Sequence, residues 1–184
     1  MKKANWLLGV TLVLACCTLA SAKDNAGTIA TVLDQNITSV EKEFVPAAEA
    51  MPEDKYSFAP TGGEFKGVRS FAAQVKHVAA VNYIIAAAIL GEKPPVDTGE
   101  EAGPASMANK ADIVKFLKDS FAYAHKATLS LSDAEAVKKG ANPFGKDQVP
   151  RMALPSWIPG HCFDHYGQMV VYLRMNGIIP PASR

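Results

Sequence analysis

The sequence predicts an all-α protein, a four-helix bundle that follows a cleaved export signal. Three observations favour this class. Four segments carry apolar residues at the three-and-four spacing of an amphipathic helix, turn-rich stretches separate them, and no run of alternating apolar and polar residues has the length of a typical strand. With 184 residues, 48% of them hydrophobic, the chain is long enough to bury one substantial core.

The first 22 residues have the pattern of a secretory signal peptide. Two lysines at positions 2 and 3 precede an apolar run from Trp6 to Ala15, and the small residues Ala20-Ser21-Ala22 follow it. The run is well short of the roughly 20 residues that cross a bilayer, which argues against a membrane anchor. We therefore expect cleavage after Ala22, a single mature domain of residues 23–184 without a stable membrane span, and a periplasmic or secreted protein.

Lipid attachment at Cys16 is a less favoured alternative, because the Val and Leu before it occupy atypical positions for a lipoprotein signal. Simple cleavage removes Cys16 and Cys17 and leaves Cys162 alone, so the mature chain has no internal disulfide. We expect Cys162 to be a small buried hydrophobic residue. Its position beside His161 leaves a reactive or metal-binding thiol as the alternative.

Charge gives little information about partners. The full chain has a formal net charge of +1, with neither a basic surplus nor an acidic block. Nucleic acid is therefore not an expected partner. The sequence leaves homodimer formation open.

The first two helices are expected on either side of a proline- and glycine-rich loop at residues 51–65. In residues 27–50 the apolar positions are Ile29, Val32, Leu33, Ile37, Val40 and Phe44. Proline lacks the amide hydrogen that a helix interior needs, so Pro46 should end or bend this helix. The second helix should run from about Gly67 to Leu90 and stop at Gly91.

The third helix should begin near Asn109, and the fourth should end at Gly177. Apolar residues of the third helix again fit a period of 3.6: Ile113, Phe116, Leu117, Phe121 and Ala124. The long stretch before the fourth helix reads as a loop without strands. Since proline is tolerated in the first helical turn, Pro159 places His161 near the helix start, with Ser156 as a candidate cap.

Three of the four histidines occupy positions that suit a metal site. His161 and His165 are four residues apart, so both imidazoles lie on one helical face. His77 lies on a mostly apolar face of the second helix, where a buried imidazole needs partners for its ring nitrogens. One divalent metal would satisfy all three. The alternatives are a surface pair on the fourth helix and a hydrogen-bonded core histidine at position 77.

Two stretches carry a family resemblance. "MPEDKYSFAPT", followed by a helix that contains a histidine, and the closing "DHYGQMVVYLRMNGIIPPAS" resemble the DinB-like metal-binding family over residues 28–183. The resemblance implies a four-helix bundle in which one histidine of the second helix and an H-x-x-x-H pair of the fourth bind one divalent metal. These positions are His77, His161 and His165, while His125 matches no ligand position.

Three protein ligands leave a coordination position open, as in catalytic rather than structural sites. Zinc, nickel and iron all accept imidazole, so the metal identity stays open. Asp164 and Gln168 are candidates to hold the metal-binding imidazoles in place. No further catalytic residue is assigned from the sequence.

The family resemblance implies either hydrolysis or thiol transfer on a small-molecule substrate. Export favours hydrolysis, since low-molecular-weight thiols are scarce in oxidising compartments. A non-catalytic metal-binding or interaction module is the alternative function. An inverted zinc-protease motif, H-x-x-D-H, is a weaker one, because no other helix offers a suitable glutamate ligand.

Overall fold

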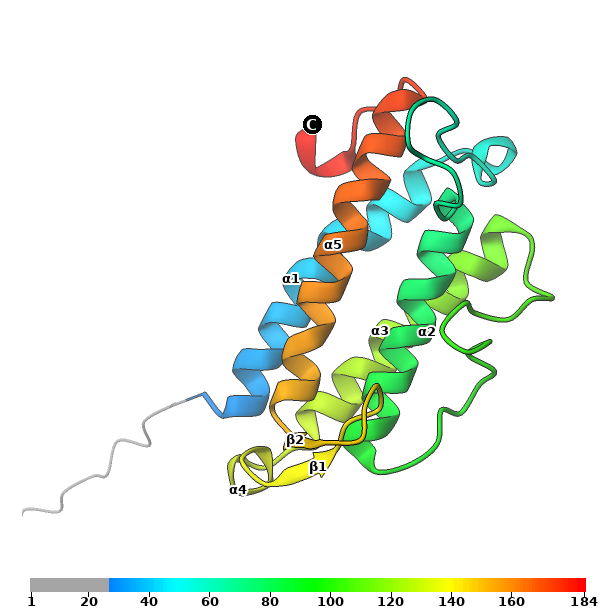
Figure 1. Ribbon diagram of the computed structural model, residues 1–184. Helices are drawn as coiled ribbons and strands as arrows, with labels where there is room; N and C mark the ends of the chain where they lie inside the picture. Colours follow the sequence, from blue (N-terminus) through cyan, green and yellow to red (C-terminus); the bar gives the residue numbers. More distant parts are fainter. Residues whose placement is uncertain (1–26) are drawn as a thin grey trace, which may run out of the picture.

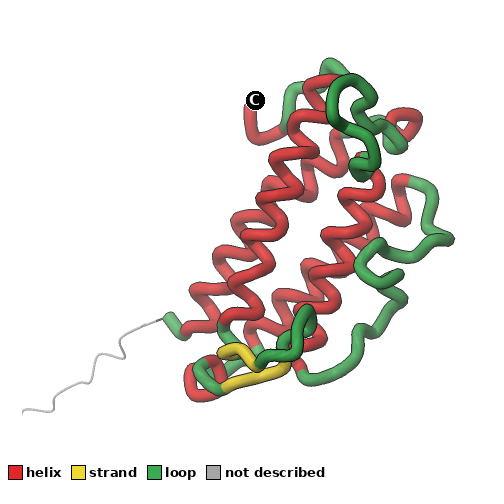
Figure 2. Tube along the Cα trace, in the orientation of Figure 1, coloured by secondary structure: helices red, strands yellow, loops and turns green. Residues whose placement is uncertain are grey.

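Four long helices make up most of the computed structural model, which describes residues 27–184 (Figures 1 and 2). They are α1 (Ile29–Ala50), α2 (Phe71–Leu90), α3 (Lys110–Leu129) and α5 (Ala153–Met175). Helix α1 contacts α3 and α5, and α2 contacts the same two helices, so the four close into a bundle. The predicted bundle of four helices is confirmed in a mostly helical fold. The expected signal peptide at residues 1–22 lies outside the described residues and stays a prediction.

Side-chain caps fix where three of the helices begin. The side-chain oxygens of Thr28, Ser70 and Asn109 each accept a hydrogen bond from the backbone N–H three residues later. Such a cap stabilises a helix by about 1 kcal/mol. Helix α2 therefore begins at Phe71, four residues later than the sequence suggested, because Gly67 has a φ of 83° that is incompatible with a helix.

Two prolines that were expected to limit helices lie inside them. Helix α1 continues past Pro46 to Ala50, so Pro46 does not end it. Helix α5 begins at Ala153 and includes Pro159. The expectation that His161 lies near the start of its helix, with Ser156 as the cap, is therefore wrong: Ser156 lies in the first turn and donates a hydrogen bond to the Ala153 carbonyl.

Packing explains why α5 tolerates an internal proline. Pro159 removes one helical hydrogen bond, which is costly in an isolated helix. On the other side of this segment Leu154, Ile158 and Cys162 are completely buried in the core. Their burial offsets the lost hydrogen bond, since each large apolar side chain contributes roughly 1.5–3 kcal/mol. His161 consequently lies in the third turn of an ordered helix.

A short hairpin between α3 and α5 was not predicted. Its strands, β1 (Lys139–Ala141) and β2 (Gln148–Pro150), pair antiparallel, with Gly140 opposite Val149. They follow a single helical turn, α4 (Asp133–Ala136). Glycine and proline are poor strand formers, and three residues are too few to show an alternating pattern. Two 3-10 turns, at Glu53–Lys55 and Pro181–Ser183, complete the described structure.

Most residues of helix α2 are buried in the bundle. Among the described residues it is the one helix long and apolar enough to cross a membrane, but 72% of that window is buried within the bundle. Cys162 of α5 is likewise fully buried, and burial raises the pKa of its thiol. A buried thiol with a raised pKa is a poor nucleophile and ligand, so Cys162 is the small hydrophobic residue that the sequence predicted.

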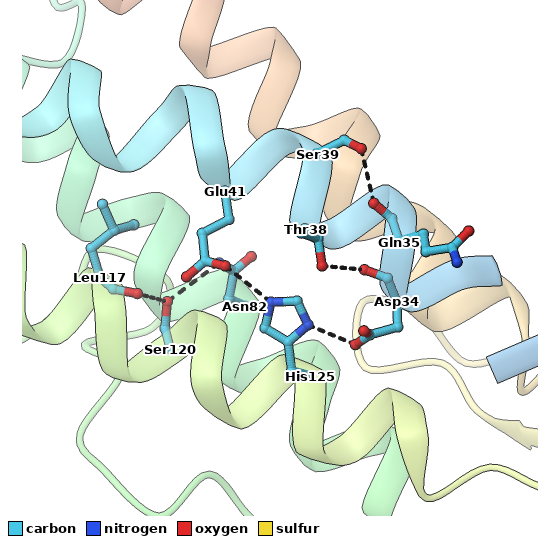
Figure 3. A network of polar contacts seen from close by, with 9 residues as sticks. All are labelled: Asp34, Gln35, Thr38, Ser39, Glu41, Asn82, Leu117, Ser120 and His125. Atoms are coloured by element: carbon cyan, nitrogen blue, oxygen red, sulfur yellow. Dashed lines mark hydrogen bonds and ion pairs between the residues drawn. The ribbon is translucent and has the colours of Figure 1, made fainter. Parts of the chain in front are cut away.

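The fourth histidine joins α3 to α1, away from the other three. His125 Nδ1 lies 2.6 Å from Asp34 Oδ1, and its Nε2 lies 3.1 Å from Glu41 Oε2 (Figure 3). Burial opposes protonation of this imidazole, but the two carboxylates outweigh it and raise the pKa of His125. His125 thus links the two helices through the carboxylates of Asp34 and Glu41, which agrees with its lack of a ligand position.

This link should make stability depend on pH. Since the pKa of His125 is higher in the folded state, its contribution is complete below the unfolded pKa of about 6.5 and is lost as pH rises through the folded pKa. We expect His125→Gln to destabilise the protein at pH 6 by on the order of 1 kcal/mol, and by less at pH 9. Urea unfolding at both pH values measures this.

The exposed neighbour Lys126 provides the control, because Lys126→Gln removes a positive charge of α3 that forms no ion pair within residues 27–184. Other titrating groups are the same in the His125→Gln and Lys126→Gln proteins, so their effects on the free energy of unfolding cancel when the two variants are compared. A His125→Gln penalty that is equal at pH 6 and pH 9 would show that the histidine is uncharged in the folded protein.

Candidate metal centre

Three imidazoles from two helices meet at one point. His77 comes from α2, and His161 and His165 come from consecutive turns of α5. His161 Nε2 lies 3.1 Å from His77 Nε2 and 3.1 Å from His165 Nε2. One potential ligand atom from each residue lies within 4.8 Å of the others. The structure therefore brings together all three histidines that the sequence selected.

Hydrogen bonds fix the tautomers of two of these histidines. His77 Nδ1–H donates to the backbone carbonyl of Glu101 at 2.8 Å. His165 Nδ1–H donates to Gln74 Oε1 at 2.5 Å, and the amide of Gln74 in turn donates to Gln168 Oε1 at 2.8 Å. With hydrogen on Nδ1, a neutral imidazole presents a bare lone pair at Nε2. Both Nε2 atoms therefore face the meeting point as acceptors.

Hydrogen bonds alone cannot satisfy this arrangement. His161 Nε2 carries at most one hydrogen when neutral, so it can donate to only one of its two neighbours. Its own Nδ1 is buried and has no partner among residues 27–184. At least one buried lone pair thus remains unpaired, at a cost of roughly 1–3 kcal/mol. A convergent set of acceptors with too few donors is the arrangement that a cation would satisfy.

Burial keeps the imidazoles neutral. It lowers the pKa of His161 to about 3, with His165, His77 and Arg69 adding to the effect. It likewise lowers the pKa of His165 to about 4 and that of His77 below its usual value. Protonating one imidazole is disfavoured because its charge would be partly buried beside two others. At pH 7 all three are in the form that binds a metal.

The loop between α2 and α3 holds the Glu101 carbonyl in place. Its backbone has positive φ at Gly99, Glu100, Glu101 and Gly103, a conformation that costs non-glycine residues about 1–2 kcal/mol each. Lys76, the residue before His77, donates to the carbonyls of Pro104 at 3.1 Å and Met107 at 3.3 Å. The strained loop is thus fastened to α2 next to the histidine that it orients.

An open cleft of about 510 Å³ gives access to the histidines. The three imidazoles line it together with charged and apolar residues. The charged residues are Arg69, Glu101 and Asp164, and the apolar residues are Val81, Ile85, Phe144 and Trp157. A small molecule or water can therefore reach the point where the imidazoles meet.

The supporting residues were only partly predicted. Gln168 does not contact His165 directly: it accepts a hydrogen bond from Gln74, which in turn accepts one from His165. Asp164 is exposed and lines the cleft, where its charge acts on His165 through space. Gln74 was missed as a site residue, although it precedes His77 by one helical turn. The role of the Glu101 carbonyl could not be predicted from the sequence, because every residue has a backbone oxygen and the residue type does not show where it points.

Comparison with known proteins places the fold. The sequence profile of the DinB superfamily matches residues 36–169, most of the chain and all three site histidines. The chain belongs to the DinB superfamily. No curated protein sequence matches it significantly. The predicted family resemblance is thereby confirmed, although the superfamily assignment alone does not specify a reaction.

Solved structures share the DinB fold at low sequence identity. A DinB-like protein from Bacillus cereus ATCC 10987 has a TM-score of 0.64 and 16% identity, covering 81% of this chain and 93% of its own. One from Bacillus subtilis has a TM-score of 0.62 and 18% identity, covering 79% and 92%. The mycothiol-dependent maleylpyruvate isomerase has a TM-score of 0.58 and 15% identity, covering 78% and 63%.

Proposed function

We propose that this DinB-superfamily chain is an exported protein in which His77, His161 and His165 hold one divalent metal, with an open coordination position for a small-molecule reaction. One observation carries the proposal: three neutral imidazoles present more Nε2 lone pairs to one point than the available hydrogens can satisfy. Hydrolysis is the first candidate reaction and transfer of a thiol is the second.

The imidazoles fit a metal ion in spacing as well as in chemistry. Tetrahedral zinc with Zn–N bonds of about 2.0–2.1 Å separates its nitrogen ligands by about 3.3–3.4 Å. The two Nε2–Nε2 distances from His161, both 3.1 Å, are close to this, and one ligand atom from each histidine lies within 4.8 Å of the others. Nickel and iron also accept imidazole ligands, and the donor set does not select among the three.

The chain's own residues would prepare the site for this role. Glu101 and Gln74 orient His77 and His165, and the surrounding α2 and α5 side chains exclude water from one side of the imidazoles. When bound, the metal would supply Lewis-acid polarisation of a substrate or a water whose pKa falls to about 7. The exposed carboxylate of Asp164 lies in the same cleft and is placed to accept a proton.

Thiol transfer is retained as the second candidate because a similar fold occurs in an enzyme described as mycothiol-dependent. Export, if it takes place, ranks it below hydrolysis. A non-catalytic module that only binds metal is the remaining alternative. The open cleft beside the histidines supports access by a small molecule and therefore favours a reaction over structural metal binding.

Metal analysis of the protein purified from its native compartment tests the proposal. We expect one equivalent of a single divalent metal per chain. Panels of ester, amide and thiol-transfer substrates, assayed with and without a chelator, then separate the two reactions. Protein without bound metal, which also fails to take up zinc, nickel or iron, would contradict the proposal. A metal-loaded protein inactive on every panel would favour the non-catalytic module.

Export has its own test. Mass spectrometry of the mature protein should show Lys23 at the amino terminus, as expected for cleavage after the Ala20-Ser21-Ala22 sequence. An intact Met1 would contradict export by this signal. A lipid on Cys16 would show that the lipoprotein alternative is correct.

A further inference from the structure

The cleft beside the three histidines is charged at one end and aromatic at the other. We propose that it binds small molecules that carry a carboxylate at one end and an aromatic or bulky apolar group at the other, with the carboxylate on Arg69 and the apolar group against Phe144 and Trp157. This inference rests on the proposed function, because it names the class of substrate for the same site.

Arg69 supplies the charged end. It lies immediately before Ser70, the residue that caps α2, and its side chain is exposed. Its guanidinium forms no ion pair or hydrogen bond within residues 27–184, although its charge is close enough to affect all three imidazoles. An arginine with no protein partner, facing a cleft, is well suited to bind a carboxylate through two parallel hydrogen bonds.

Aromatic and aliphatic side chains form the other end. Val81 and Ile85 follow His77 at intervals of four residues on α2, so they continue its face away from Arg69. Trp157 precedes His161 by four residues on α5. Phe144, in the turn of the hairpin, has its ring centroid 6.3 Å from that of Trp157 and is 45% exposed. An exposed Phe144 beside a partly buried Trp157, with Val81 and Ile85 lining the same cleft, suits a flat apolar group.

The order of these groups follows from the helix directions. Contacts pair Gln74 with Gln168 and the Ile89 carbonyl with Arg151, so α2 and α5 run antiparallel. Along both helices the histidines therefore lie between Arg69 and the aromatic pair. His77 and Ile85 are separated by about 12 Å along the axis of α2. A ligand with a short polar spacer between its two ends would place that spacer beside the histidines.

The charge of the cleft favours a ligand with one negative charge. Glu101 and Asp164 line the same cleft as Arg69, so without a metal the carboxylates outnumber the single guanidinium. A divalent ion reverses this sign. We therefore expect the metal-loaded protein to accept a monoanion and the metal-free protein to bind it more weakly.

N-Benzoylglycine is a suitable probe, because it has an aromatic group, an amide spacer and one carboxylate. Its neutral amide, N-benzoylglycinamide, lacks the charge, and N-acetylglycine lacks the aromatic ring. Calorimetry on the zinc-loaded full chain should show the acid binding at least about tenfold more tightly than either analogue. Zinc content is measured on the same sample.

Two substitutions locate the ends. Arg69→Gln should remove the preference for the acid over the amide without changing the affinity for the amide. Phe144→Ala should lower the affinity for both benzoyl compounds and leave the affinity for N-acetylglycine unchanged. Lys66→Gln is the matched control, since Lys66 is an exposed cation three residues before Arg69 and outside the cleft.

The outcomes separate this inference from the proposed function. A zinc-loaded protein that shows no preference for the acid, or that keeps this preference in Arg69→Gln, overturns the inference and leaves the metal centre intact. The second result would mean that the carboxylate binds the metal rather than Arg69. A protein that takes up no metal contradicts the proposed function itself.

Discussion

Replacing His77, His161 or His165 with alanine should remove nearly all bound metal. Each substitution leaves two imidazoles, and a site with two protein ligands binds a divalent ion far more weakly than one with three. His161→Ala should lose metal as fully as the other two variants, because His161 lies in the third turn of α5 and not at its start. Metal analysis after dialysis against a weak chelator measures the loss.

The fourth histidine provides the control for this series. His125→Gln changes a histidine that contacts Asp34 and Glu41 instead of the site, and it should keep one metal per chain. A His77→Ala protein that binds metal as tightly as the wild type would show that the three-histidine site is wrong.

Stability should change in opposite directions with and without metal. At a free metal concentration one hundred times the Kd, binding stabilises the folded state by about 2.7 kcal/mol, and each alanine variant loses this contribution. In the metal-free state the wild type retains buried, unpaired imidazole nitrogens, which cost roughly 1–3 kcal/mol. His161→Ala should therefore melt below the metal-loaded wild type and no lower than the metal-free wild type, since His161 Nδ1 has no hydrogen-bond partner to lose. If the histidine had only a structural role, its replacement would lower the melting temperature of the metal-loaded and the metal-free protein alike.

The bundle could be predicted because its signals repeat along the chain. Ile37, Val40 and Phe44 recur at helical spacing and are completely buried, as the amphipathic pattern of α1 required. The helix boundaries were harder, because local rules for proline do not include tertiary packing. At Pro159 the burial of Ile158 and Cys162 outweighs a lost hydrogen bond. The sequence alone does not show that these two residues are buried by the other helices.

The meeting of the three histidines could be predicted for a different reason. His161 and His165 are related by a fixed helical interval, and the family resemblance assigned the third position to His77. Gln74 was within reach of the same argument, since it shares a face with His77 and contacts His165. The groups that orient the imidazoles are less visible when they come from distant loops. The Glu101 carbonyl reaches His77 only because the loop between α2 and α3 folds back over α2.

The backbone conformation of this loop affects the candidate metal centre. Gly99, with a φ of 52°, donates its N–H to Asp97 Oδ1 at 2.8 Å, and Gly103 donates to the Thr98 carbonyl at 2.9 Å. A Cβ atom at Gly99 would collide with the Gly103 carbonyl. A Cβ atom at Gly103 would lie 2.9 Å from the Lys76 Cβ. The turn that presents Glu101 therefore has no room for a side chain at either glycine.

Gly99→Ala should weaken metal binding although residue 99 touches neither the metal ligands nor the cleft. The collision must move the turn and with it the Glu101 carbonyl, which leaves the Nδ1–H of His77 without its acceptor and its ring free to rotate. Loss of a hydrogen bond that orients a ligating histidine typically lowers metal affinity by about 10–100-fold. Competition with a chromogenic chelator, using zinc, measures this change.

Gly91→Ala is the control that separates movement of the turn from the cost of placing a side chain at a positive φ. Gly91 also has a positive φ, 72°, but a Cβ atom there meets nothing within 4 Å and the residue only ends α2. Gly91→Ala should therefore destabilise the fold by about 1–2 kcal/mol and keep the metal affinity of the wild type. If Gly99→Ala behaves like Gly91→Ala, with lower stability and unchanged affinity, the Glu101 carbonyl does not orient His77. If only Gly99→Ala lowers the affinity for metal, the loop between α2 and α3 orients His77 for metal binding.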